Sequence, residues 1–253
     1  MMKRIAILSV LGCLLTAVAW GMNVDSLKVA ADSAYAREDF AAAAKCYGRI
    51  AQAGESAAVC YNLGNCYYRM DDVARAILWY ERALLLSPGD EDIRFNLNMA
   101  RGKTIDRVTP EHEFFFVTGW RAMVNTMSAD DWARLSIVLF VIALAGLAVY
   151  LYVGRMAVRK VGFTVSVVFV LLTVLGNLCA WSQHRSQTER REAIVMASSA
   201  TVRSTPSASG SDLFVLHEGT KATVKDNTLG DWVEIALSDG KQGWIERQQI
   251  EFI

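Results

Sequence analysis

The chain has 253 residues, of which 53% are hydrophobic and 21% are charged. The charges of its 26 basic and 26 acidic side chains cancel. No excess of positive charge favours nucleic-acid binding, so we predict no nucleic-acid partner. The apolar excess is local, because it is concentrated near the N-terminus and in residues 135–181.

Residues 1–21 have the pattern of a secretory signal peptide. Lys3 and Arg4 precede an apolar run over residues 5–19, and small residues follow near its end. This order of a basic region, a short apolar region and a small-residue site predicts cleavage after Ala19 or Gly21. Acylation of Cys13 is an alternative, but the apolar run continues beyond that residue.

Residues 22–107 contain a helical repeat. The segment 57–90 matches the tetratricopeptide (TPR) pattern at Leu63, Gly64, Tyr67, Ala76, Tyr80, Ala83 and Pro88. The preceding stretch repeats it at an offset of 33, with Ala43 and Tyr47 in the places of Ala76 and Tyr80. Residues 90–101 begin a third unit whose second helix is missing, so they predict a capping helix. We therefore expect an all-α TPR domain.

The first helix of each TPR unit lines a concave groove that binds extended peptides. The side chains predicted on this face are Lys28, Asp32, Tyr35, Tyr61, Asn65, Tyr68, Arg69, Phe95 and Met99. Exposed aromatic rings among Asn and Arg are typical of peptide recognition. The alternative is that Tyr61 and Tyr68 only pack on neighbouring helices. Cys46, Cys60 and Cys66 are expected to be small core side chains, with a Cys46–Cys60 disulfide as the alternative.

Residues 108–134 form an aromatic approach to the central apolar region. Phe116, Trp120, Met123 and Met127 recur at helical spacing, which predicts an amphipathic segment lying in a membrane interface. The alternative is a helix that packs in the groove of the repeat. Ser128 is expected to cap the next helix.

Residues 135–153 and 161–181 are two uncharged apolar runs, each about long enough to cross a bilayer. The loop 154–160 between them contains Arg155, Arg159 and Lys160 and no acid. We predict a two-helix transmembrane hairpin with this loop in the cytoplasm, because translocation starts at the signal peptide and the first span stops it. Asn177 is expected to bond across the pair. The alternative is a pair of core helices in a soluble protein.

A polar linker is predicted over residues 182–191, and a small all-β domain over residues 192–253. Strands are expected at 193–196, 201–204, 213–216, 221–225, 232–237 and 243–245, which indicates a closed barrel. The segments around Val202, Gly219, Trp232 and Gly243 resemble bacterial SH3-like domains. Trp232 and Trp244 are expected to pack this barrel. Similar domains bind peptides or cell-wall peptide stems, so the two rings are also a candidate ligand face.

No arrangement of residues predicts catalysis. His112, His184 and His217 lie in different segments without metal-ligand spacing, and no phosphate-binding loop or nucleophile motif occurs. The sequence therefore predicts a protein that is not an enzyme and that has no cofactor and no metal site.

The order of these segments resembles the TPR-bearing, BatE-like members of the Bacteroides aerotolerance (Bat) family. The resemblance implies a scaffold in the bacterial inner membrane, with the TPR and SH3-like domains in the periplasm. Its implied partners are membrane lipid, other Bat proteins, some with von Willebrand A domains, and indirectly a cytoplasmic MoxR-type ATPase. The alternatives are a cell-wall sensor that binds peptidoglycan peptides, and a redox component that uses a reactive thiol among Cys46, Cys60 and Cys66.

Overall fold

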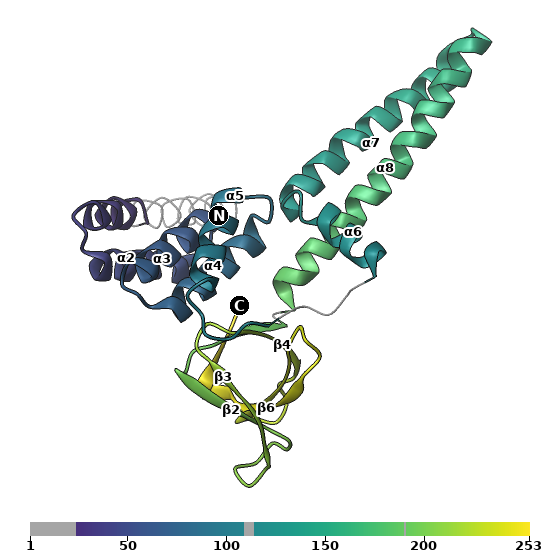
Figure 1. Ribbon diagram of the computed structural model, residues 1–253. Helices are drawn as coiled ribbons and strands as arrows, with labels where there is room; N and C mark the ends of the chain where they lie inside the picture. The colour runs from purple at the N-terminus through teal and green to yellow at the C-terminus, as the bar shows by residue number, and fades with distance from the viewer. Residues whose placement is uncertain (1–23, 109–113, 190) are drawn as a thin grey trace, which may run out of the picture.

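The computed structural model describes residues 24–108, 114–189 and 191–253. The predicted signal peptide lies outside these residues, as does His112. The described chain forms a helical repeat, a pair of long helices and an antiparallel β-sheet (Figure 1). The repeat and the sheet lie at the same end of the helix pair, which projects away from both of them (Figure 1).

The helical repeat begins with a helix over residues 24–36. It continues with α2 (Phe40–Ala53), α3 (Ala57–Arg69), α4 (Val73–Leu86) and α5 (Glu91–Arg101). Each of these four helices starts after an Asp or Ser whose side chain accepts a hydrogen bond from a backbone N–H of the first turn. Glu38 and Asp71 have positive φ angles of 63° and 61° at equivalent turns, which are 33 residues apart as the sequence repeat predicts.

Close packing between α3 and α4 depends on Gly64. A Cβ atom at Gly64 would lie 2.5 Å from Cδ1 of Tyr80, whose side chain is fully buried. The four described cysteines are free, so the Cys46–Cys60 disulfide is not formed. Burial raises the pKa of the Cys60 and Cys66 thiols to about 12, which keeps both protonated at neutral pH.

The long helices are α7 (Ala129–Tyr152) and α8 (Met156–Thr188), preceded by the short helix α6 (Phe115–Val124). Only 17% of the most apolar 18-residue stretch of α7 is buried, and only 11% of that of α8. The core helices of a soluble domain are mostly buried, so both helices are candidate membrane spans. Ser128 caps α7 as predicted. The connecting turn is shorter than the predicted loop, because Arg159 and Lys160 already lie in the first turns of α8.

Small residues let α7 and α8 approach closely. A Cβ atom at Gly146 would lie 2.9 Å from the carbonyl oxygen of Gly162, and one at Gly162 would lie 2.8 Å from that of Gly146. Farther along the pair, Ser136 faces Gly176 in the same way. The hydrogen bond expected from Asn177 across the helix pair is not formed. Nδ2 of Asn177 donates to the carbonyl oxygen of Thr173 in its own helix, since small residues and not amides occupy the interface.

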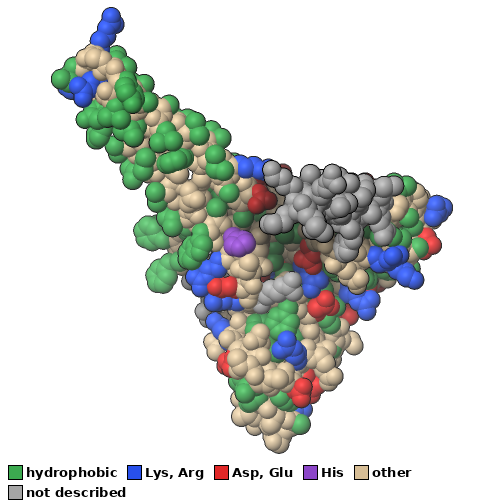
Figure 2. All heavy atoms as spheres, turned by 180° about the vertical axis from the view of Figure 1, so that it is seen from behind, with side chains coloured by type: hydrophobic (Ala, Val, Ile, Leu, Met, Phe, Trp, Pro, Cys, Tyr) green, Lys and Arg blue, Asp and Glu red, His purple; other side chains and the backbone are tan. Residues whose placement is uncertain are grey.

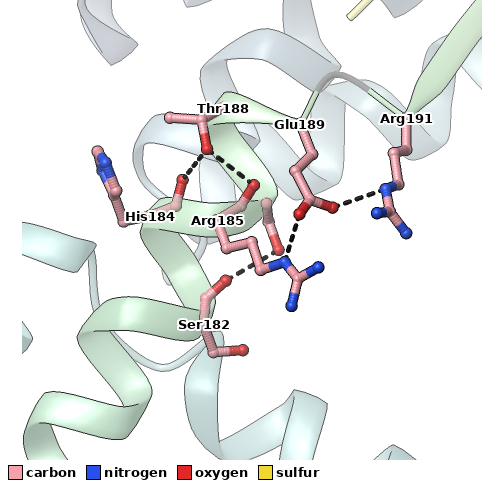
Figure 3. Close-up of polar contacts among 7 residues, drawn as sticks. Ser182, His184, Arg185, Thr188, Glu189 and Arg191 are labelled. Atoms are coloured by element: carbon pink, nitrogen blue, oxygen red, sulfur yellow. Dashed lines mark hydrogen bonds and ion pairs between the residues drawn. The ribbon is translucent and has the colours of Figure 1, made fainter.

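Residues 182–191, predicted as a linker, are helical as far as Thr188. The Nε2 groups of Gln183 and Gln187 both donate to the carbonyl oxygen of Leu85 at the end of α4. Figure 3 shows the end of α8, where Glu189 pairs with Arg185 and, at 2.6 Å, with Arg191. The helix continues because its polar side chains bond the repeat and each other.

The β-sheet contains seven strands in the order β3-β2-β6-β5-β4-β1-β7 and curls round on itself (Figure 1). The strands are β1 (Glu192–Val195), β2 (Ser199–Arg203), β3 (Asp212–His217), β4 (Lys221–Asp226), β5 (Trp232–Ala236), β6 (Gln242–Glu246) and β7 (Ile250–Phe252). Sequence reasoning missed β7. Gly243 permits the close approach of β6 to its neighbour β2, because a Cβ atom there would lie 2.9 Å from the carbonyl oxygen of Arg203.

The sheet is docked on the helical repeat. Ile194 of β1 and Ile253 after β7 share one buried cluster with Ile77 of α4 and Leu97 of α5. The Arg82 guanidinium donates to the carbonyl oxygen of Phe252 at 2.7 Å. The sequence predicts the repeat and the β domain as separate units on either side of the helix pair, whereas in the structure they share a common core.

Residues 102–108 follow α5, and Asp106 holds them against the β-sheet. The Asp106 carboxylate accepts hydrogen bonds from the backbone N–H of His217 at 2.7 Å and from Oγ1 of Thr220 at 2.6 Å, and it lies 2.8 Å from Nδ1 of His217. Burial alone would raise the pKa of Asp106, but these hydrogen bonds outweigh burial and lower it.

This lowered pKa predicts acid sensitivity. The ionised Asp106 carboxylate contributes stability that is complete above the unfolded-state pKa of about 4 and is lost as the pH falls through the lower folded-state pKa. Unfolding of the full chain by denaturant should therefore show a steeper loss of stability on acidification than unfolding of the Asp106→Asn variant. Identical slopes below about pH 5 in the two proteins would contradict this role.

Candidate peptide-binding site

A cavity of about 180 Å³ opens between the first helices of successive repeat units. Its lining comes from residues 24–36, α3, α4 and α5 and consists of Tyr35, Asn65, Tyr68, Arg69, Tyr80, Asn96 and Met99. Five of these residues belong to the set predicted for the concave face. Tyr80 and Asn96 were missed. Tyr80 stands at a TPR signature position that is normally assigned to packing, and no local signal marks Asn96.

Asn65 is the centre of the hydrogen bonds in this cavity. Its Oδ1 accepts from the hydroxyl of Tyr80 at 2.7 Å and from Nδ2 of Asn96 at 3.0 Å. Burial raises the pKa of Tyr80, so its hydroxyl stays protonated and remains a donor. With its oxygen occupied twice, the Asn65 side chain is fixed, and its Nδ2 group has no acceptor within the described residues. This group can donate to the carbonyl oxygen of a bound chain.

Cations stacked on aromatic rings stand beside the cavity. The Arg69 guanidinium lies 4.7 Å from the centre of the Phe40 ring, and Nζ of Lys103 lies 4.5 Å from that of Tyr68. Arg69 is half-exposed and lies 3.9 Å from the Glu38 carboxylate. Such an exposed ion pair contributes little, so Arg69 can exchange this carboxylate for one on a ligand.

The remaining predicted residues are placed differently. Lys28 and Asp32 lie outside the cavity lining. They pair with each other at 2.9 Å, and the Asp32 carboxylate also accepts a hydrogen bond from the hydroxyl of Tyr47. Tyr61 packs on Tyr80 and accepts a hydrogen bond from Asn96, as in the packing alternative. Phe95 is 65% exposed and is free to contact a ligand beside the cavity.

Trp232 and Trp244 lie outside the core of the β-sheet. The core contains their neighbours Val233 and Ile245, which are fully buried. Because side chains alternate along a strand, the two tryptophans lie on the opposite face, where both are half-buried. The expectation that they pack the barrel interior is thus replaced by a position on its outer face, where Trp244 stands opposite Glu234.

Among residues 24–108, 114–189 and 191–253, no group of three or more His, Cys, Asp or Glu side chains is placed to hold a metal ion.

Two family models match parts of the chain. Residues 57–90 match the tetratricopeptide repeat, and residues 198–251 match the bacterial SH3 domain. The chain has no significant match among curated proteins. The TPR match covers α3 and α4, which contribute Asn65, Tyr68, Arg69 and Tyr80 to the cavity. Strand β1, which carries Ile194 into the core of the repeat, precedes the residues matched to the SH3 domain.

Proposed function

We propose that this protein is a non-enzymatic, membrane-anchored adaptor that holds extended segments of partner proteins in the cavity of its helical repeat. TPR and SH3 domains are in general protein-binding modules. The observation that carries the proposal is the fixed Asn65 side chain, whose free donor lies in a cavity flanked by Tyr68 and Arg69. A pre-organised amide donor beside aromatic and cationic groups recognises a peptide backbone with little loss of conformational entropy.

The adaptor is anchored by α7 and α8. The 33 residues of α8 span about 50 Å, which exceeds the roughly 30 Å of bilayer hydrocarbon and leaves its last turns to reach α4. Figure 2 shows hydrophobic side chains over most of the helix pair and Lys and Arg at its far end. The predicted signal peptide then places the repeat and the sheet in the periplasm and the short connecting turn in the cytoplasm.

Helix α6 supports this placement. It packs against α8 and exposes Phe114, Phe115, Phe116 and Trp120, with the three Phe side chains each more than 70% exposed. Aromatic side chains at the end of a membrane span favour the headgroup region. We therefore place α6 in the outer interface of the membrane.

The resemblance to the Bat family refines the proposal. We infer that the bound segments belong to other Bat proteins and that the assembly serves aerotolerance or stress resistance. The turn between α7 and α8 leaves only Val153, Gly154 and Arg155 between the helices. Coupling to a cytoplasmic MoxR-type ATPase would accordingly run through partner subunits.

A double substitution at the cavity tests this function. Arg69→Ala with Met99→Ala should lower the recovery of cross-linked partner proteins about tenfold or more, since each removes an exposed contact at the cavity. The matched control is Arg75→Ala with Leu229→Ala, which also removes one Arg and one exposed apolar side chain, both outside the cavity lining. Pull-down of the full chain with mass spectrometry measures the recovery. Equal recovery with both double variants would contradict the proposal.

A cell-wall sensor is the second candidate, and the outer-face position of Trp232 and Trp244 favours it. Half-buried rings beside Glu234 form a surface on which a peptidoglycan stem peptide can stack. Under this alternative, replacing both tryptophans with alanine abolishes cross-linking to cell-wall peptides, while the cavity variants have no effect.

A further inference from the structure

The far end of the helix pair carries positive charge that no acidic residue in the described part of the chain balances. Arg155, Arg159 and Lys160 lie there, and the sequence contains no Asp or Glu between Asp131 and Glu189. Within the described residues, Arg155 and Lys160 form no ion pair. Three cations so close together in an apolar helix pair require an anion from outside the chain or water.

A cavity of about 470 Å³ opens beside these cations. It is lined by Tyr150, Met156, Arg159, Lys160, Phe163 and Thr164. The rings of Tyr150 and Phe163 are in contact, with their centres 5.5 Å apart, and they form one aromatic wall. The cavity therefore combines two cations with an apolar lining.

Arg159 is held in place at this cavity. Its Nε donates to the carbonyl oxygen of Tyr150 at 3.1 Å, and its guanidinium carbon lies 5.2 Å from the centre of the Tyr150 ring. The close approach of α7 and α8 at Gly146 and Gly162 fixes the helices nearby. The terminal nitrogens of Arg159 have no partner within the described residues, so they can donate to an anion.

We propose that this cavity binds the phosphate group of an anionic phospholipid, with Arg159 and Lys160 as its charge partners. The proposal rests on the membrane span of the proposed function. A guanidinium and an ammonium group provide several donors for phosphate oxygens, and basic pockets between membrane helices on the cytoplasmic side are suited to anionic headgroups. Tyr150 and Phe163 contact the first carbons of the acyl chains.

The surroundings of the cavity favour a lipid over a soluble anion or an acidic protein segment. Met156, Val161 and Phe163 are 67%, 63% and 53% exposed around it. This apolar surface continues along α7 and α8, where only a hydrocarbon environment satisfies it. A ligand that joins a negative headgroup to hydrocarbon chains matches both parts of the surface.

Lipid retention by the full chain tests the proposal. The protein is reconstituted in equimolar phosphatidylglycerol and phosphatidylcholine, extracted mildly, and examined by native mass spectrometry for the lipid that it retains. The wild type should retain phosphatidylglycerol in preference. Arg159→Gln with Lys160→Gln should reduce this preference about fivefold for each cation removed. Arg159→Lys with Lys160→Arg should preserve it, because the charges remain.

The matched control is Arg134→Gln with Lys225→Gln, which removes two exposed cations away from the cavity and should keep the preference. Equal retention of both lipids by the wild type, or an unchanged preference in the Arg159 and Lys160 double Gln variant, would overturn the proposal. Displacement of the lipid by excess inorganic phosphate would also overturn it, since the ligand would then be free phosphate. Release of the chain from phosphatidylcholine vesicles by alkaline carbonate would instead refute the membrane span itself.

Discussion

Replacing Glu81 with alanine is expected to lower the free energy of unfolding by about 1–3 kcal/mol and to loosen the β-sheet from the helical repeat. The Glu81 side chain is 5% exposed and pairs with Arg101 and, at 3.0 Å, with Lys221 of β4. Lys221 also lies 2.6 Å from the Glu192 carboxylate. Loss of Glu81 leaves two cations near a buried interface with a single remaining carboxylate.

The charge state of Lys221 supports this expectation. Burial alone would lower the pKa of Lys221, but the carboxylates of Glu81 and Glu192 outweigh burial and raise it. The ammonium group is therefore charged at neutral pH and depends on both acids. Removing the more deeply buried acid leaves the Lys221 ammonium with Glu192 as its single partner, so less of its desolvation cost is offset.

Denaturant unfolding of the full chain and hydrogen exchange of β1 and β7 measure the effect. The matched control is Asp71→Asn, because Asp71 also pairs with a lysine, Lys103 at 2.7 Å, but is 80% exposed, and Asn tolerates the positive φ of 61° at this position. Such an exposed pair should contribute little, so the control should retain wild-type stability and exchange. The interpretation fails if the Glu81 variant and the control unfold alike.

Substitution of Gly162 by leucine is expected to separate α7 from α8. A Cβ atom at this position would lie 2.8 Å from the carbonyl oxygen of Gly146 and 2.9 Å from the backbone nitrogen of Tyr150, and backbone atoms cannot rotate away. Overpacking of this kind costs about 1–3 kcal/mol or forces the helices apart. The contacts that position Arg159 beside Tyr150 would be lost together with the helix crossing.

The control is Gly154→Leu in the connecting turn, where nothing lies within 4 Å of the added Cβ atom and where φ is not positive. Titration of the full chain with sodium dodecyl sulfate, followed by tryptophan fluorescence, gives the midpoint of unfolding in micelles. The Gly162 variant should unfold at a lower detergent fraction than the Gly154 variant. Equal midpoints would show that α7 and α8 do not require this close approach.

Part of the candidate site could be predicted because the TPR pattern is local. The signature residues Leu63 and Gly64 mark the first helix of the unit, and the first helix lines the groove in TPR arrays. Asn65, Tyr68 and Arg69 are therefore assigned to the concave face from the sequence. Asn96 could not be assigned, since its contact with Asn65 depends on how α5 packs across α3. The peptide-binding role of these residues stays a prediction.

The sequence by itself determined the features that depend on a few neighbouring residues. The matched repeat at 57–90, the cap at Ser128, the two uncharged apolar runs and the SH3-like strands all follow from such short-range patterns. Only the tertiary structure decided how these parts meet. Glu81 and Lys221 are 140 residues apart in the chain, and Gln183 lies 98 residues from Leu85. No local pattern encodes such pairs, because each depends on the packing of an entire helix against another element. Through these contacts the repeat and the sheet, which the sequence predicts as separate segments, share one core at the base of the helix pair.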